Sequence, residues 1–472
     1  MIDDQGGQQL SIKYIDPLLI PLAKRVDIMV KYVFVKYYDQ LGMRGWLERL
    51  YCDHIGAFNG FVEGKGEEKL GKESFINSFR ETIASIKANG YIDSADPIPV
   101  GRSGIPLDGA HRIAASLYFN SNIKLYKSRE KEFVYDYKFL LDRGLRRKYI
   151  DLAAVEYCRL VPNSFVAIVY PSAQGKDKEV EEIFSRWGSI FYRKDVSVRR
   201  AGACTLVRQI YSGESWLGCW ENGFSGASGK AALCWQKPGV ARVFVLESTV
   251  DRMLCAKEEV RNLFNIGKHS VHITDSQEQS IHLGQVLLND TSIKFLNYAL
   301  PKYFRRFSGF FDSYKSSLGG GRYNEEAYCI DGSSVLSVFG IRDSRDLDYL
   351  YHDCYSKLDA GSDVHSHNEE AKYYGKDIID IIYDPENFFH FENMKFVSID
   401  LVRKMKLSRA EKKDRSDIKE IDILLGSRKS RARIFSRQIW RCLSIRSIML
   451  AIEVGKMRFN YFVAKLKNWI RM

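Results

Sequence analysis

Short runs of consecutive apolar residues alternate with helical segments along the whole chain. Residues 165–170 (FVAIVY) and 242–246 (RVFVL) are apolar and rich in β-branched side chains, as buried strands are. Residues 28–35 form another apolar run, which Lys31 interrupts, and they predict a core helix or a strand. Because strands and helices alternate in every part of the chain, the pattern predicts an α/β to α+β architecture.

The length of 472 residues exceeds what one ordinary hydrophobic core accommodates, so the chain is expected to be multidomain. A charged run at 127–132, a glycine-rich stretch at 317–322 and Gly426 mark soft boundaries. These breaks predict a first domain at 1–130, a mixed α/β domain at 131–300, a third domain at 301–426 and a basic amphipathic helical tail at 427–472.

The positive charge of the chain is concentrated in the tail. Residues 427–472 hold 12 of the 71 Lys and Arg residues but only one of the 59 Asp and Glu residues, so they carry almost the whole net charge of +12. Trp, Phe and aliphatic residues interleave with these cations, as in amphipathic helices that bind anionic lipid surfaces. Docking onto the protein's own body and binding of nucleic acid are the alternatives. Nucleic acid is the least favoured partner because phosphate contacts need no Trp.

The cysteine pattern and the apolar runs indicate the cellular compartment in which the protein is expected to work. The nine cysteines form no CxxC pair, which predicts reduced thiols and no structural zinc. No apolar run reaches the about 18 residues of a membrane span, and we expect no secretory leader at the start of the chain. We therefore expect a cytoplasmic protein that is peripheral to the inner face of the cytoplasmic membrane.

The clearest chemistry lies in the third domain, in DGSSVLSVFGIRDSRDLDYL at residues 331–350. Transfer of a phosphate-bearing group needs a divalent metal held by carboxylates and a backbone that can approach phosphates closely. On a strand, Asp346 and Asp348 would share one face and hold Mg²⁺ or Mn²⁺. The residues expected to bind the donor phosphates are Gly332, Ser333, Ser334, Arg342 and Arg345.

This string resembles the nucleotidyltransferase superfamily, in which Gly-Ser on a short helix is followed by an Asp-x-Asp strand. The family's later helical signature has a counterpart at Lys413, Asp414 and Asp417, so the resemblance covers residues 327–425. The opening is also similar to LicD-type phosphotransferases of surface glycan decoration, whose longer Trp-Asp-Asp-Asp stretch this sequence lacks. The resemblance implies Mg²⁺-dependent transfer from a nucleotide donor such as CTP, ATP or a CDP-linked group.

The superfamily's third carboxylate has two candidates, Asp377 and Asp380. Apolar residues flank Asp380 on both sides, which fits a strand facing the site, so Asp380 joins Asp346 and Asp348 in the predicted catalytic set. One alternative is that Asp346 and Asp348 are surface charges in a turn. Another is an inactive module that keeps the fold without a complete metal site.

A second candidate site lies in the first domain, in IPVGRSGIPLDGAHRIAA at residues 98–115. A strand is expected to deliver Asp108 and Gly109 to a tight turn, after which His111 and Arg112 open a helix. Amide groups at a helix N-terminus with an adjacent Arg make an anion pocket. The string resembles the DGxHRxxAA box of the ParB/sulfiredoxin-like superfamily, whose members bind nucleotide phosphates there.

Some members of that superfamily are nucleotide-dependent kinases, and others are partition proteins that use CTP and DNA. On the kinase analogy, Glu63 would act as a general base for a hydroxyl nucleophile. The alternative is structural: Asp108 caps the helix, and His111 and Arg112 are surface residues of it. No helix-turn-helix pattern follows the box, so DNA binding is the weaker inference.

The middle domain carries two glycine- and serine-rich stretches, at 211–218 and 222–230. The second is no P-loop, because Ala231 follows Lys230 where Ser or Thr is required. Cations, imidazoles and an acid gather nearby at Lys257, Arg261, Lys268, His269, His272 and Asp275. These residues either form an edge that contacts a phosphate or a sugar, or they are ordinary structural polar residues. The spacing of the histidines and the acid is only a weak signal for metal ligands.

Together, these features resemble bacterial enzymes of surface polysaccharide or lipopolysaccharide assembly. They predict a transferase with a nucleotide-activated or phosphate-bearing donor, a glycan or lipid-linked acceptor, and an anionic membrane surface bound by residues 427–472. One alternative is a ParB/sulfiredoxin-type kinase. Others are a regulatory nucleotide- or DNA-binding protein with an inactive nucleotidyltransferase fold, or an interaction scaffold with two decayed nucleotide folds.

Overall fold

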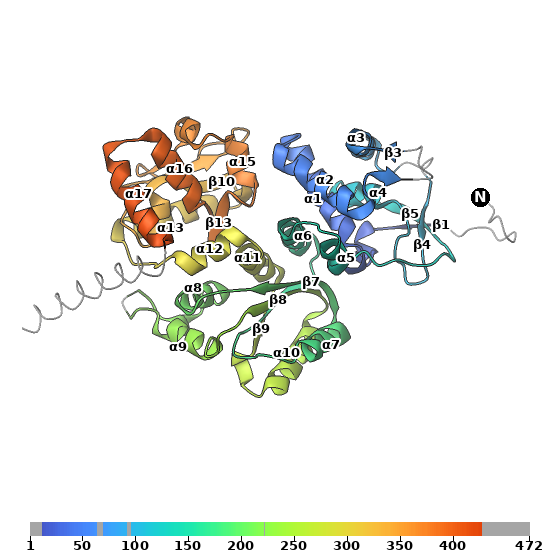
Figure 1. Cartoon of the computed structure of the whole chain (residues 1–472), viewed down its shortest axis with the longest axis horizontal. Helices are drawn as coiled ribbons and strands as arrows, with labels where there is room; N and C mark the ends of the chain where they lie inside the picture. The colour runs from blue at the N-terminus through green and yellow to red at the C-terminus, as the bar shows by residue number, and fades with distance from the viewer. Residues whose placement is uncertain (1–11, 64–68, 92–95, 221, 427–472) are drawn as a thin grey trace, which may run out of the picture. The chain divides into compact units, whose positions relative to one another are not determined.

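The structure is a computed structural model that describes residues 12–63, 69–91, 96–220 and 222–426. The fold is mixed α/β and thus agrees with the predicted class, and sheets form within each of the three predicted domains (Figure 1). By compactness the chain divides into two units, Met1–Val402 and Arg403–Met472. The finer division into four domains remains a prediction.

The first sheet contains three strands in the order β1-β5-β4, with β1 antiparallel and β4 parallel to β5. Its strands and the adjoining pair β2-β3 are β1 (Ile12–Ile15), β2 (Val62–Glu63), β3 (Lys69–Leu70), β4 (Ile98–Val100) and β5 (Ile123–Lys127). The accompanying helices are η1 (Pro17–Leu19), η2 (Leu22–Lys24), α1 (Val26–Leu41), α2 (Gly45–Asn59), α3 (Lys72–Asn89) and α4 (Ala110–Tyr118).

The apolar run at 28–35 lies within α1, so the helical alternative is the correct one. All of these residues are buried, because α1 packs against α2, α4 and α6 (Arg147–Leu160). The ammonium of Lys31 lies 3.3 Å from the carboxylate of Asp27, one turn earlier. Arg25 pairs with the same carboxylate at 2.8 Å, so the buried charges compensate one another.

The middle sheet has four strands in the order β7-β8-β6-β9, and every neighbouring pair is antiparallel. These strands are β6 (Ser164–Val169), β7 (Ser189–Val196), β8 (Ala241–Glu247) and β9 (Val271–Ile273), which confirms both strands predicted from apolar runs. With α7 (Asp177–Trp187) after β6 and α10 (Val250–Phe264) after β8, the order is βαββαβ, the split βαβ arrangement. Apolar side chains of both helices and of the sheet form one core.

Further helices surround and interrupt this arrangement. Between β7 and β8 the chain inserts α8 (Arg200–Ile210), η3 (Ser215–Leu217) and α9 (Ser225–Cys234). The remaining elements before residue 300 are α5 (Tyr137–Asp142), α6, η4 (Gly267–His269), α11 (Gln277–Leu287) and α12 (Asp290–Tyr298).

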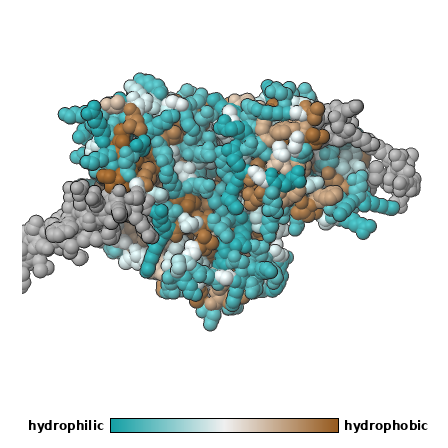
Figure 2. Space-filling model, in the orientation of Figure 1, coloured by the Kyte–Doolittle hydropathy of each residue, from teal (hydrophilic) through white to brown (hydrophobic). Residues whose placement is uncertain are grey.

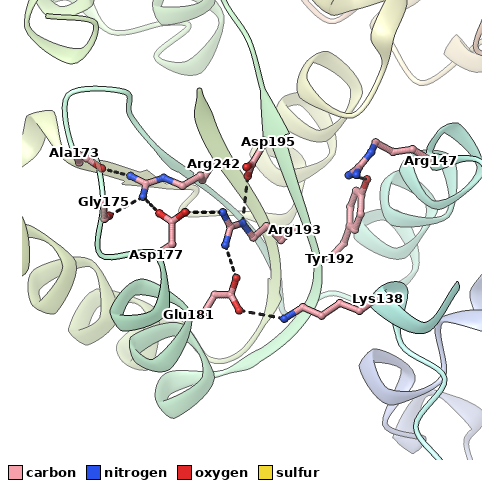
Figure 3. Close-up of polar contacts among 10 residues, drawn as sticks. All are labelled: Lys138, Arg147, Ala173, Gly175, Asp177, Glu181, Tyr192, Arg193, Asp195 and Arg242. Carbon is pink, nitrogen blue, oxygen red and sulfur yellow. Dashed lines mark hydrogen bonds and ion pairs between the residues drawn. The ribbon is translucent and has the colours of Figure 1, made fainter. Parts of the chain in front are cut away.

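A network of ion pairs fastens α7 to the sheet (Figure 3). Arg193 on β7 lies 3.0 Å from Asp177 and 3.2 Å from Asp195, and it also pairs with Glu181. Arg242 on β8 contacts the same Asp177 in the first turn of α7. Because Arg193 and Arg242 are largely buried, these carboxylates neutralise charges that would otherwise be costly.

The third sheet is mixed and has five strands in the order β12-β11-β10-β14-β13. Its strands are β10 (Tyr328–Asp331), β11 (Leu347–Tyr351), β12 (Val364–Ser366), β13 (Phe388–Phe391) and β14 (Met394–Val397). The helices around it are α13 (Arg305–Leu318), η5 (Glu325–Ala327), α14 (Gly332–Val338), η6 (Asn368–Tyr374) and α15 (Ile378–Tyr383). α16 (Ile399–Arg409) follows β14 directly.

Buried ion pairs connect distant segments of the first unit. Lys36 of α1 lies 2.6 Å from Glu156 of α6, and Arg159 of α6 lies 2.6 Å from Glu326 of η5. Lys395 of β14 lies 3.6 Å from the same Glu326. These contacts join segments from all three predicted domains.

The second unit contains the end of α16 and α17 (Lys412–Leu425), where the later helical signature was predicted. Lys406 lies 3.2 Å from Asp414 and 2.9 Å from Asp417, and Arg409 also pairs with Asp414. The acids of the signature therefore join two successive helices. The predicted amphipathic tail at 427–472 lies outside the described residues.

The face of the protein drawn in Figure 2 is largely hydrophilic, with smaller hydrophobic areas between the polar ones. Across the described ranges, none of the helices combines the length and the apolar character that crossing a lipid bilayer requires.

Candidate functional site

The predicted transfer site forms around the β10–α14–β11 segment. Asp331 ends β10, Gly332 begins α14, and antiparallel pairing places Asp331 opposite Asp348 of β11. A short Gly-Ser helix is followed by a strand containing Asp348, as predicted, but β11 begins at Leu347, so Asp346 lies directly before the strand and not on it. Gly332 has φ +62, and a Cβ atom there would lie 2.6 Å from Oδ2 of Asp348. Only glycine allows the helix to begin this close to the carboxylate.

Asp331 is fully buried, and two side chains from η6 and the loop before it hold its carboxylate. The hydroxyl of Tyr374 donates to one oxygen, and Nδ1 of His367 lies 2.8 Å from the other. Although burial lowers the pKa of His367, the hydrogen bond to Asp331 and the charges of Asp331 and Asp348 raise it. The carboxylate of Asp331 is thus held in place by two side chains, and its contact with His367 favours the protonated imidazole.

Asp348 is a partly buried member of this acidic group and has a different environment. Burial raises the pKa of Asp348 to about 6, and the charges of Asp346 and Asp331 add to the effect, while His367 and His365 oppose it. Among the described residues its carboxylate has no hydrogen-bond or ion-pair partner. A partly buried carboxylate beside two others favours binding a proton or a cation.

The histidines beside the acids were not predicted from the sequence. β12 runs parallel to β11 and places His365 beside Asp348, so Asp331, Asp348 and His365 form a row across three strands. His367 follows two residues later on the same face. The alternation in Val364-His365-Ser366-His367 was the available signal, but a strand so short gives little periodicity to detect.

The predicted phosphate-binding residues have mixed environments. Ser334 is fully buried, and its hydroxyl donates to the carbonyl of Asp346 at 3.3 Å, so it positions the chain before β11. Ser333 is half-buried at the start of α14. Arg345 is exposed directly before Asp346, whereas the guanidinium of Arg342 donates to the carbonyl of Asp343 at 3.1 Å.

The strand predicted around Asp380 is wrong, because residues 378–383 form helix α15. Asp377 caps this helix, accepting from the amide of Ile379 at 2.8 Å, and lies 3.3 Å from Arg44, the residue before α2. Burial raises the pKa of Asp380, and the principal opposing charge is Arg44. The charges that act on Asp380 thus come from Arg44, Asp377, Lys376 and Arg49. None of these acts on Asp348, whose neighbours are His367, Asp346, Asp331 and His365.

A cage of three or more protein ligands is not present within the described ranges, where no group of His, Cys, Asp and Glu has the required geometry. Mg²⁺, however, is usually bound by one or two carboxylates together with water and substrate phosphates. Asp346 and Asp348 satisfy that smaller requirement. They are the residues of this face that could hold a metal.

The DGAHR segment of the first domain begins α4, as predicted. A loop delivers Asp108, since β4 already ends at Val100, so the expected strand is too long. Gly109 occupies the N-cap position with φ 75, and no side chain caps the helix. The alternative in which Asp108 caps α4 is therefore wrong, and its exposed carboxylate lies 3.8 Å from Arg112.

The polar side chains of this segment make contacts within their own domain. Nε2 of His111 lies 2.9 Å from the hydroxyl of Tyr51, and Arg112 donates to the carbonyl of Asp96 at 2.7 Å. His111 is thus packed rather than a plain surface residue. Glu63, the predicted general base, lies in β2, but its side chain is outside the described part. The kinase and regulatory alternatives remain predictions.

Comparisons of the chain with protein-family models, with curated proteins and with solved structures found no match. The resemblances drawn from the sequence therefore remain predictions, and the geometry of the sites is the basis for a function.

Proposed function

We propose that this protein is a Mg²⁺-dependent transferase whose active site is the face that carries Asp331, Asp346 and Asp348. The observation that supports it best is Asp348, a largely buried carboxylate without a partner in the described part of the chain, beside two further acids. Structural carboxylates of this kind are normally paired with a cation or a donor. An unpaired one is characteristic of a site that receives its counter-charge from a ligand.

Asp346 and Asp348 are the proposed metal ligands. When bound, a divalent cation neutralises phosphate charge and orients the group to be transferred. Asp331, fixed by Tyr374 and His367, adds negative potential behind the ligands without joining them. Ser334 supports the arrangement by holding the backbone of Asp346.

The donor is proposed to be a nucleotide-activated or phosphate-bearing molecule, such as CTP, ATP or a CDP-linked group. Gly332 lets the backbone approach it, and Ser333 can donate a hydrogen bond to a phosphate oxygen. Arg345, exposed next to Asp346, is placed to neutralise charge on the transferring group, and Arg342 is the second cation of this loop.

The acceptor is proposed to be a glycan or a lipid-linked glycan of surface polysaccharide or lipopolysaccharide assembly. This part of the proposal depends on the sequence resemblance and on the basic tail at 427–472. A lipid-linked acceptor would explain why a protein without a spanning helix among its described residues carries a basic, aromatic-rich segment.

The proposal is tested by measuring the melting temperature of the full-length protein with a nucleotide panel, with and without Mg²⁺. A ligand that binds only the native state raises the melting temperature by mass action. We expect a joint effect of Mg²⁺ and nucleotide in the wild type and its loss in the Asp346→Asn/Asp348→Asn double variant. The exposed Asp251→Asn substitution is the control, because it removes a carboxylate from α10, which lies outside the third sheet and the helices around it.

Mg²⁺-dependent stabilisation that persists unchanged in the double variant would refute the metal assignment. A second measurement follows release of pyrophosphate or nucleoside phosphate from the donor in the presence of candidate glycan acceptors. Turnover that is equal in the wild type and the double variant would refute the active-site assignment.

A further inference from the structure

A second candidate site lies in the middle domain, where the inserted helices meet the β9 edge of the sheet (Figure 1). The pocket has a volume of about 620 Å³ and is lined by residues of α8, η3, α9, α10, η4, β9 and α11. That volume is in the range of small-molecule sites, about 300–1,000 Å³. The two glycine-rich stretches and the cation cluster noted in the sequence, separate along the chain, all contribute to it.

The pocket carries an excess of positive charge. Lys230, Lys257, Arg261 and Lys268 line it, against the acids Glu214 and Asp275. Lys257 lies 3.3 Å from Asp275, and Arg261 lies 2.5 Å from Glu258, which is outside the lining. Lys230 is only 8% exposed, its ammonium donates to the carbonyl of Lys268, and no described carboxylate neutralises it. Burial lowers the pKa of Lys230, and the charges of Lys268 and Arg261 lower it further. A buried ammonium among cations needs an anion to offset its cost.

Two lining nitrogen atoms have no partner in the described part of the chain. Nε of Arg261 and Nδ1 of His269 are buried and make no hydrogen bond. Buried polar atoms of this kind cost free energy unless a ligand or water satisfies them. Arg261 and His269 line the pocket together with Lys230.

Aromatic rings line the same pocket, and the ammonium of Lys230 lies 5.7 Å from the centroid of the Tyr211 ring. The ring of Tyr211 lies edge-on to Trp216 at 5.1 Å and to His272 at 4.9 Å. Trp216 is 43% exposed, so part of its indole remains open to a ligand. Burial and the nearby cations lower the pKa of His272 to about 3, so the imidazole is neutral at physiological pH. An aromatic wall facing cations suits a ligand with both a ring and a negative charge.

The glycines of α9 keep the pocket open. A Cβ atom at Gly229 would meet nothing within 4 Å, so the space beside this helical position is empty. At Gly226, a Cβ atom would lie 1.8 Å from the carbonyl oxygen of Trp216, so α9 packs directly against η3. A Cβ atom can thus be added at position 229, which lines the pocket, without a clash.

We propose that this pocket binds a small metabolite in which a phosphate ester is attached to a ring, as in sugar phosphates and nucleotides. The phosphate is bound by Lys230, Arg261 and Lys268, and the ring lies against Trp216 and Tyr211. The assignment is independent of the transfer site around Asp348, because none of its residues belongs to that face.

The test measures binding to the full-length protein by isothermal titration calorimetry with four probes: inorganic phosphate, glucose, glucose 1-phosphate and uridine monophosphate. We expect a phosphorylated ring compound to bind more tightly than inorganic phosphate and glucose to show no binding. Comparison of glucose 1-phosphate with uridine monophosphate distinguishes a sugar phosphate from a nucleotide.

Two variants place the binding in this pocket. Lys230→Met removes the buried charge with little change of volume and should weaken binding at least about tenfold, as loss of a charge-assisted hydrogen bond does. Gly229→Leu fills the empty space and should abolish binding, while the melting temperature shows that both variants are folded. Lys178→Met, an exposed residue of α7 outside the pocket, is the charge-matched control and should bind as the wild type does.

The proposal is overturned if none of the phosphorylated probes binds at millimolar concentration, or if Lys230→Met and Gly229→Leu bind them as tightly as the control. Loss of binding in the Asp346→Asn/Asp348→Asn variant with retention in these two variants would place the ligand at the transfer site instead.

Discussion

At the transfer face, the backbone of Gly332 and the carboxylate of Asp348 occupy one small space. A side chain at 332 would collide with Asp348, and the positive φ disfavours any residue but glycine. Burial at this position raises the pKa of Asp348, and the charges of Asp346 and Asp331 add to the effect. The conformation at Gly332 and the charge at Asp348 are therefore coupled. One substitution at each residue tests the two effects.

Gly332→Ala should destabilise the protein beyond the cost of backbone strain alone. Alanine in a left-handed conformation costs about 1–2 kcal/mol, and the collision with Asp348 adds to it. Gly60→Ala is the control, because Gly60 has φ +67 but open space around its missing Cβ. Urea unfolding should show a larger loss for Gly332→Ala than for Gly60→Ala; equal losses would contradict the close packing.

Asp348→Asn should stabilise the metal-free protein near neutral pH. A carboxylate whose pKa is about 6 when folded and 3.8 when unfolded favours folding when protonated, so it lowers stability increasingly as the pH rises through 6. Its removal should add about 1–3 kcal/mol at about pH 8 and almost nothing at about pH 4. Unfolding in urea with EDTA at both pH values measures this gain, and a loss of stability at the higher pH would refute it.

Sequence reasoning found the acids of the site but not their partners. The spacing of Gly332, Asp346 and Asp348 is local, so a motif of twenty residues carries it. His367 and Tyr374 reach Asp331 only because η6 and the loop before it fold back beside β10. The effect of Arg44 on the pKa of Asp380 likewise depends on a tertiary contact. The periodicity of a single sequence does not reveal such contacts.

At the scale of elements, the apolar runs at β6 and β8 correctly predicted strands that are buried on both faces of the sheet. Strands β6 and β8 appeared as predicted because their residues are buried on both sides of the sheet. The run around Asp380 misled for the same reason, since a short buried helix and a buried strand have the same apolar composition. The βαββαβ order was beyond prediction, because strand pairing is set by contacts distant in sequence.

The attachment of α7 to the sheet should depend on ion pairs and therefore on pH. Despite burial, hydrogen bonds and charges from Arg242 and Arg193 lower the pKa of Asp177, and those from Arg193 and Lys138 lower that of Glu181. Their contribution to stability is thus present above the unfolded pKa values and is lost as the pH falls through the folded ones.

Arg193→Met removes the central cation of this network. It should cost about 2 kcal/mol at neutral pH, as loss of hydrogen bonds to charged groups does, and the deficit should shrink in acid. Amide hydrogen exchange should show faster opening of α7 than of α10. Arg200→Met, an exposed residue of α8, is the control. A deficit that does not change between neutral pH and acid would argue against the ion pairs as its source.

At the scale of the whole molecule, two features have opposite electrostatic character. Within the first unit, Arg159 lies 3.6 Å from Glu156 and 2.6 Å from Glu326, so its charge is compensated internally. Of the 13 charged residues in the tail at 427–472, 12 are cations, and the rest of the chain offers no matching excess of acids. The tail's counter-charge is therefore expected to come from outside the chain.

Deletion of residues 427–472 should abolish binding of the protein to anionic vesicles. Each cation near an anionic surface contributes about 1 kcal/mol, and salt weakens this attraction. Sedimentation with phosphatidylglycerol vesicles should pellet the full-length protein at low salt, much less of it at high salt, and none of the truncated one. Neutral phosphatidylcholine vesicles are the control for lipid charge. Equal pelleting of both proteins would exclude the tail as the membrane contact, and tighter binding to double-stranded DNA than to vesicles would favour nucleic acid as its partner.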